Sequence, residues 1–199
     1  MGGNRNHPKK GSIIKVEPIR RREDRRHIEV FLAGRPRDLA LFVTGTNTNV
    51  RASDLVRLAV GHVRGVRAGD ELVLREKKTR KVRRIVVNAK VVGALQAWLA
   101  VHPWRESEGA PLFPNRRTGN ALTVPAVSTL VKGWCRAAGL AGNYASHSLR
   151  KSFGYAQRVE HGVGVAVLMT LFGHSSERQT LSYLGVDDGE VRAVYLQEV

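Results

Sequence analysis

The chain has 199 residues, 42% of them hydrophobic and 25% charged, and its formal net charge is +16. These proportions exclude a disordered chain and favour one globular domain with a buried core. No apolar run approaches the roughly 20 residues of a membrane-spanning helix, and the basic N-terminus lacks the apolar segment of a secretory signal. We therefore expect a cytoplasmic protein with no membrane partner.

The excess of basic residues is the clearest clue to a partner. The chain has 33 Lys and Arg residues against 17 Asp and Glu residues. A domain this basic usually binds a polyanion, most often nucleic acid, although a solvated basic surface without a specific partner has the same composition. Cys135 is the only cysteine, which excludes an internal disulfide and a multi-cysteine zinc site. No cluster of metal-binding carboxylates or histidines is recognisable, so we expect no metal.

Three regions are expected along the chain. Residues 1–27 form a basic arm, which is either a disordered tail or a phosphate-binding extension that includes Arg21 and Arg22. Residues 28–186 form the folded domain. Residues 187–199 form an amphipathic tail.

Apolar spacing and capping residues predict a mainly helical α+β domain. A helix starts near Arg22 and is ended by Gly34, and Pro36 opens the next. A polar turn is expected over 45–49. Asn88 is expected to cap one helix, and Gly162 and Gly173 to end two others. The remaining helices are expected over 37–45, 51–58, 89–101, 125–138, 147–161, 165–172 and 177–184.

A β-hairpin is expected in the middle of the chain. Its strands cover 71–75 and 82–87, and residues 61–69 are a candidate third strand. The connection between the strands is very basic. It is either a solvated hairpin tip or a DNA contact, which Lys77, Lys78, Arg80 and Lys81 would make.

Several residues of the C-terminal half, with two basic residues upstream of it, suit the breakage of a phosphodiester by covalent catalysis. Without a metal, that reaction needs cations for the developing phosphate charge, an in-line nucleophile and an acid for the leaving oxygen. Arg51 and Arg150 can hold the phosphate, with His174 as a further donor. Tyr183 can attack, and Lys78 can reach the leaving oxygen.

These residues lie in segments that resemble the tyrosine recombinase, or phage integrase, family. Asn49-Val50-Arg51-Ala52-Ser53-Asp54-Leu55 resembles its first arginine box, and Lys78 matches the hairpin lysine. His147-Ser148-Leu149-Arg150 matches the His-x-x-Arg box, and Phe172-Gly173-His174 the following Gly-His box. Tyr183 lies nine residues after His174, at the spacing of the family's nucleophile. Each motif alone is weak, but six in the right order form a strong signal.

The resemblance implies the helical catalytic domain of a recombinase and a mechanism. Tyr183 would form a 3′-phosphotyrosyl bond, with Lys78 as general acid and His147 as general base, without metal, ATP or another cofactor. The partners implied are double-stranded DNA and, in a tetramer on two DNA sites, further copies of the chain, with the tail from Asp187 exchanged between them. Lys151, beside Arg150, is a further candidate DNA contact.

Three features depart from the family pattern. Asn49 and Arg80 occupy positions that are often glycine, and we expect the family's N-terminal core-binding domain to be missing. A DNA-binding accessory protein and a type IB-like DNA-relaxing enzyme therefore remain alternatives, and a generic RNA-binding domain is more distant. Tyr144, Tyr155 and Tyr195 are the other tyrosines that could compete with Tyr183 as the nucleophile.

Overall fold

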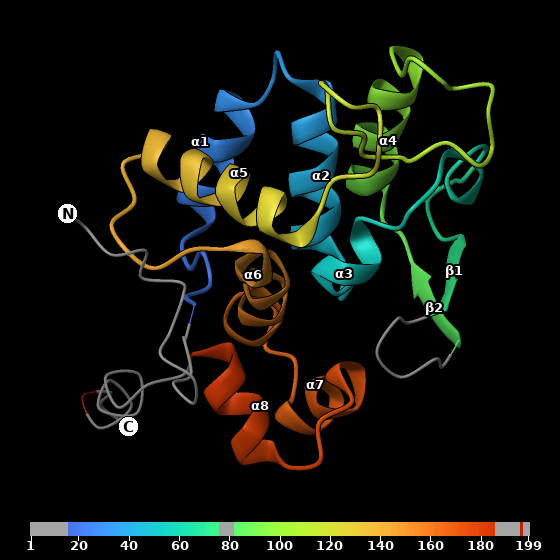
Figure 1. The fold of residues 1–199 in the computed structure, drawn as a ribbon. Helices are drawn as coiled ribbons and strands as arrows, with labels where there is room; N and C mark the ends of the chain where they lie inside the picture. Colours follow the sequence, from blue (N-terminus) through green and yellow to red (C-terminus); the bar gives the residue numbers. More distant parts are fainter. Residues whose placement is uncertain (1–15, 76–81, 186–195, 197–199) are drawn as a thin grey trace, which may run out of the picture.

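The computed structural model describes residues 16–75, 82–185 and 196 (Figure 1). Helices make up most of this part of the chain, and one pair of strands lies at its edge. None of the described helices has the length and apolar character needed to cross a membrane. The helices are α1 (Arg22–Phe31), α2 (Pro36–Asn47), α3 (Ala52–Leu55), α4 (Ala89–Ala100), α5 (Val124–Ala137), α6 (Ser146–Val159), α7 (Val165–Phe172) and α8 (Glu177–Leu184).

The ends of the helices follow the signals in the sequence. Pro36 is the first residue of α2, and the side chain of Asn88 accepts a hydrogen bond from the backbone N–H of Val91 at the start of α4. Gly173 ends α7 with φ +67°, a left-handed conformation that glycine adopts without steric cost. The predicted mainly helical class is confirmed.

Three local predictions were wrong. The helix expected over 51–58 is shorter, because α3 covers only Ala52–Leu55 and Arg51 precedes it. The polar turn expected over 45–49 begins later, because α2 continues to Asn47 and the hydroxyl of Thr46 donates to the Phe42 carbonyl within the helix. The third strand expected over 61–69 is not among the described elements. Val60–His62 form a short 3₁₀ helix instead, and positive φ angles at Gly65 and Gly69 turn the chain that follows.

The predicted hairpin is confirmed over its strands. β1 (Glu71–Arg75) pairs antiparallel with β2 (Val82–Val86). Leu72, Leu74 and Ile85 are buried. The basic connection with Lys77, Lys78, Arg80 and Lys81 lies outside the described residues.

Helix α2 lies at the centre of the main core. It packs on α4 and on α6, and Phe42 meets the ring of Trp134 from α5 edge to face. Gly45 allows α2 to approach α6 closely, since a Cβ atom there would lie 2.7 Å from Cδ1 of Leu149. This contact holds the start of α6 next to the segment that follows α2.

The end of the basic arm packs on the domain. The side chain of Ile19 is fully buried, and its backbone N–H donates to the hydroxyl of Ser152 on α6 at 2.7 Å. Arg25 of α1 donates to the carbonyls of Ile19 and Arg20. The described part of the arm is thus attached to α6.

A smaller apolar cluster joins α7 and α8 to α6. Leu168, Phe172 and Leu184 form its buried centre. Gly154 of α6 lies directly beneath it, because a Cβ atom there would lie 2.5 Å from both Cζ of Phe172 and Cδ2 of Leu184. The position of α8 therefore depends on the absence of a side chain at residue 154.

We expect Gly154→Ala to destabilise the protein by about 1–3 kcal/mol, the usual cost of overpacking a core. Thermal unfolding measures this loss. The matched control is Gly133→Ala in α5, where an added Cβ has no neighbour within 4 Å. That variant should gain about 0.5–1 kcal/mol from the better helix propensity of alanine. An equal effect of both substitutions would contradict the close contact at Gly154.

Candidate active site

Five of the six predicted catalytic residues lie on the ends of four short segments. Arg51 immediately precedes α3, and His147 and Arg150 lie in the first turn of α6. His174 follows the left-handed Gly173, and Tyr183 lies near the end of α8. Arg51 is near enough to His147, His174 and Tyr183 to affect the pKa values of all three. The sixth residue, Lys78, lies outside the described residues.

Arg150 is the most firmly held of these side chains. It is only 5% exposed, and its Nε donates to Oδ1 of Asn49 at 2.7 Å. Its Nη2 lies 3.3 Å from the carbonyl oxygen of Phe172. The guanidinium carbon also lies 5.0 Å from the ring centre of Phe172 and 6.0 Å from that of Tyr183. These contacts fix both the position and the plane of the guanidinium.

Tyr183 lies in a small aromatic cluster. Its ring centre is 5.2 Å from the ring centre of Phe172 and 5.2 Å from that of His174, and the rings of Phe172 and His174 stack at 5.4 Å. The ammonium of Lys151 lies 5.4 Å from the ring centre of Tyr183. Two cationic side chains, Arg150 and Lys151, therefore adjoin the predicted nucleophile.

The imidazole of His174 is oriented by a buried hydroxyl. Its Nδ1 lies 3.1 Å from Oγ1 of Thr180, a fully buried residue of α8. Because Nδ1 faces Thr180, Nε2 is the ring nitrogen that Thr180 does not contact. Thr180 thereby links the turn of His174 to the helix that carries Tyr183.

The surroundings shift the pKa values of all three titratable groups. Burial lowers the pKa of His174, and the charges of Arg150 and Arg51 lower it further. Burial also lowers the pKa of His147, and the positive charges of Arg150, Lys151 and Arg51 lower it further. Part of the His147 side chain nevertheless remains exposed to solvent. Burial raises the pKa of Tyr183, against the opposing effect of Arg150 and Arg51. At neutral pH both imidazoles are thus uncharged, and the phenol keeps its proton.

These shifts predict a loss of activity at acidic pH if His147 accepts the proton of Tyr183. Its pKa in the folded protein lies below the ordinary value of 6.5, so the base stays neutral at pH 7 and is protonated only as the pH falls through that lowered pKa. We expect the rate of covalent DNA attachment, measured from pH 8 to pH 5 at saturating protein, to fall in the acidic half. Stability should fall in the same direction, because the unfolded chain binds these protons more readily.

The variant His147→Gln is the control for this profile. It removes the titrating group, so its rate of covalent attachment should be lower. The decrease of that rate at acidic pH should also disappear in this variant. A wild-type rate that rises as the pH falls would contradict the assignment of His147 as a base, because the charged imidazole would then be the active form.

The predicted DNA-binding residues lie in different surroundings. Lys151 is 8% exposed and its ammonium donates to the carbonyl of Val16 at 2.8 Å, so in this conformation it holds the N-terminal segment and is not presented to a DNA phosphate. Arg21 and Arg22 are exposed. They line a cavity of about 1170 Å³ between α1 and the C-terminal part of α6.

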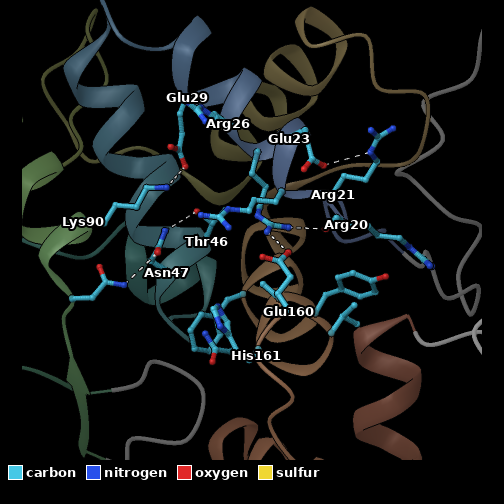
Figure 2. Close-up of a pocket in the computed structure, with 18 residues that line it drawn as sticks. Arg20, Arg21, Glu23, Arg26, Glu29, Thr46, Asn47, Lys90, Glu160 and His161 are labelled. Carbon is cyan, nitrogen blue, oxygen red and sulfur yellow. Dashed lines mark hydrogen bonds and ion pairs between the residues drawn. The ribbon is translucent and has the colours of Figure 1, made fainter.

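Figure 2 shows this cavity. Its labelled side chains are mostly charged, and acidic residues accompany the basic ones: Arg21 lies near Glu23, and Lys90 is paired with Glu29. The cavity reaches His161, beyond the last turn of α6, whereas His147 lies in the first turn. At 1.5 Å per residue, the two ends of α6 are about 20 Å apart. None of the five described catalytic residues lines this cavity, so Arg21 and Arg22 belong to a separate surface.

Three residues of the site escaped the sequence analysis as contributors. Asn49 contacts Arg150, and Thr180 contacts His174. Arg83 of β2 donates to the carbonyl of Leu171 at 2.6 Å. Asn49 was noticed only as a departure from a glycine. Nothing in its sequence context indicated a contact with a residue 101 positions away.

Comparisons with known proteins agree with the motifs. Residues 32–190 match the model of the phage integrase family. The probable integrase/recombinase YoeC of Bacillus subtilis (strain 168) is 31% identical over 183 residues, which cover 90% of this chain and 95% of that protein. Tyrosine recombinase XerC of Haemophilus ducreyi (strain 35000HP / ATCC 700724) is 30% identical over 159 residues, which cover 80% of this chain and 51% of that protein. The chain thus spans about half the length of XerC.

Solved structures show the same fold. The XerA recombinase superposes with a TM-score of 0.73 at 20% sequence identity, over 96% of this chain and 66% of that one. The XerH site-specific recombinase, bound to a palindromic difH substrate in a post-cleavage complex, gives a TM-score of 0.71 at 20% identity, over 94% of this chain and 54% of that one. With the family match over most of its length, this chain belongs to the phage integrase family and has the catalytic domain of a tyrosine recombinase.

Proposed function

We propose that this protein is a site-specific DNA recombinase that cleaves and rejoins strands through a 3′-phosphotyrosyl bond at Tyr183. One observation carries the proposal: Tyr183 lies within the same small cluster as Arg150 and His174. That combination brings a nucleophile next to groups that stabilise charge on a phosphate.

Arg150, Arg51 and His174 would hold the non-bridging oxygens of the scissile phosphate. A guanidinium donates two parallel hydrogen bonds to a phosphate, and a fixed one stabilises the transition state without first reorganising. Arg150 meets this condition best, because its plane is set by Asn49 and by the aromatic rings beside it. His174 would donate from Nε2 in the tautomer in which its Nδ1 accepts a hydrogen bond from the hydroxyl of Thr180.

Tyr183 would attack the phosphorus in line and lose its proton to His147. The raised pKa of the phenol makes such a base necessary at neutral pH, and the lowered pKa of His147 keeps the imidazole neutral. Lys78 would protonate the 5′ oxygen that leaves. A 5′-hydroxyl of another strand would then attack the phosphotyrosyl phosphorus and give its proton to Lys78. The bond to Tyr183 would break, and His147 would return its proton to the phenolate oxygen.

The energy of the broken phosphodiester is kept in the phosphotyrosyl ester, so neither ATP nor a metal ion is part of the proposed reaction. The partner is double-stranded DNA, and we propose a tetramer on two DNA sites as the active assembly. Since Arg21 and Arg22 line a charged cavity that none of the described catalytic residues lines, we assign them to DNA that flanks the cleavage site.

Incubation with supercoiled plasmid DNA, followed by a denaturing gel and peptide mapping, tests the proposal. A covalent adduct mapped to Tyr183, together with products in which two DNA sites are joined, is expected. Relaxation of the plasmid without any joining would favour a relaxing enzyme. DNA binding without an adduct on any tested substrate would favour an accessory protein.

A further inference from the structure

Asn49 occupies a position where the family often has glycine, and its side chain is 3% exposed. It follows the end of α2 and precedes Arg51 by two residues. A buried amide needs partners for both its oxygen and its nitrogen. The partners that it finds belong to two other parts of the candidate active site.

The carboxamide of Asn49 has only one orientation that satisfies both contacts. Arg150 Nε–H is a donor, so the oxygen Oδ1 must face it, at 2.7 Å. The carbonyl of Leu171 is an acceptor, so the nitrogen Nδ2 must face that oxygen. Asn49 thus joins Arg150 to the last turn of α7, two residues before the turn that carries His174.

The carbonyl of Leu171 has a second donor. Nη2 of Arg83 lies 2.6 Å from it, and Arg83 belongs to β2, the strand that follows the basic connection with Lys78. A chain of hydrogen bonds therefore runs from Arg150 through Asn49 and Leu171 to the hairpin. Four segments that are far apart in the sequence meet at this point.

We propose that Asn49 is a positioning residue for Arg150, which it holds by Nε so that Nη1, and the N–H of Nη2 that does not face Phe172, are directed to the scissile phosphate. Because the amide is neutral, it fixes the guanidinium without compensating its positive charge. A carboxylate in the same place would form a buried ion pair with Arg150 and compete with the phosphate. The inference rests on the proposed function, because it concerns the hold of Arg150 on that phosphate.

The variants Asn49→Ala and Asn49→Asp disturb this role in two different ways. The alanine removes both contacts, and the aspartate keeps the acceptor for Arg150 but adds a charge and loses the donor to Leu171. We expect each to slow covalent attachment roughly 10- to 100-fold at saturating protein, the scale of a misplaced catalytic group. The apparent affinity for DNA should stay within about twofold, because one buried contact adds little to the electrostatic binding of so basic a chain.

Thr48→Val is the matched control. Thr48 is 2% exposed and lies next to Asn49, and its hydroxyl donates to the carbonyl of Thr44 in the last turn of α2 at 2.6 Å. Its loss should lower stability without slowing attachment by the folded protein. A similar slowing by Thr48→Val would show that Asn49 acts through general stability and would overturn the proposal.

A double-mutant cycle with Arg150→Lys tests the route of the effect. If Asn49 acts through Arg150, Asn49→Ala should slow the Arg150→Lys protein by less than twofold, whereas independent effects would multiply. Full multiplication of the two losses would overturn the proposal. Unchanged attachment by Asn49→Ala alone would do the same.

A measurement without activity keeps this test distinct from the test of the proposed function. In a ¹⁵N-edited spectrum of arginine side chains, the Nε–H of Arg150, identified by its absence in Arg150→Lys, should exchange slowly with solvent. It should exchange faster in Asn49→Ala and remain slow in Asn49→Asp. A fast Nε–H in the wild type would sink the assignment of Asn49 whatever the DNA assay gives, and absence of any wild-type adduct would count against the recombinase proposal alone.

Discussion

Tyr183→Phe should reduce covalent attachment to DNA by about 10⁴-fold or more, the scale of loss when an enzyme lacks its covalent nucleophile. The substitution removes only the hydroxyl. The ring contacts with Phe172 and His174 and the position over Lys151 do not depend on that oxygen. We therefore expect unchanged folding and DNA binding, which separates a chemical loss from a structural one. The measurement is the yield of protein–DNA adduct on a denaturing gel over time.

Other tyrosines provide the controls for this experiment. Tyr155 lies on α6, its ring beneath the guanidinium of Arg20 at 5.4 Å, and faces the cavity at the far end from His147. Tyr155→Phe and Tyr195→Phe should both retain attachment. An adduct formed by the Tyr183→Phe protein, or one lost in either control, would reassign the nucleophile.

The positions of His147, Arg150 and His174 in the fold could be predicted from the sequence because their motifs are local. His147 and Arg150 share one helical turn, and His174 follows a glycine that must end a helix, so spacing alone placed them. Helix caps such as Asn88 were equally readable, since each depends on residues within three positions. The family resemblance then supplied the order of the boxes and the roles.

The supporting contacts could not be predicted because they join distant residues. Asn49 and Arg150 are 101 positions apart, and Lys151 and Val16 are 135 apart. Lys151 looked like a DNA contact because it is basic and adjoins Arg150, but the packing of the N-terminal segment on α6 buries it. The expected third strand over 61–69 failed for a different reason, since Gly65 and Gly69 have positive φ angles that turn the chain.

Arg150→Lys should slow covalent attachment roughly 10²- to 10³-fold, the usual cost of losing one preorganised donor to a developing charge. Lysine keeps the positive charge, so bulk attraction to DNA is unchanged. It lacks the flat fork that binds two phosphate oxygens, and its ammonium cannot reproduce the Nε contact with Asn49 while it faces a phosphate. A loss of about 1–3 kcal/mol in stability is also expected, because the oxygen of Asn49 loses its buried partner.

Arg37→Lys separates these two losses. Arg37 is another buried arginine, 6% exposed, whose guanidinium pairs with Asp38 and donates to the carbonyl of Pro114 in a part of the main core that holds none of the catalytic residues. Its replacement should lower the unfolding temperature by a comparable amount while the folded protein attaches to DNA at the wild-type rate. Equal slowing of attachment by both variants would mean that stability limits the assay. A wild-type rate in the Arg150→Lys protein would show that the guanidinium of Arg150 is dispensable in the transition state. Slowing confined to Arg150→Lys is the result that the geometry of its guanidinium predicts, because only there does the arginine lie beside Tyr183.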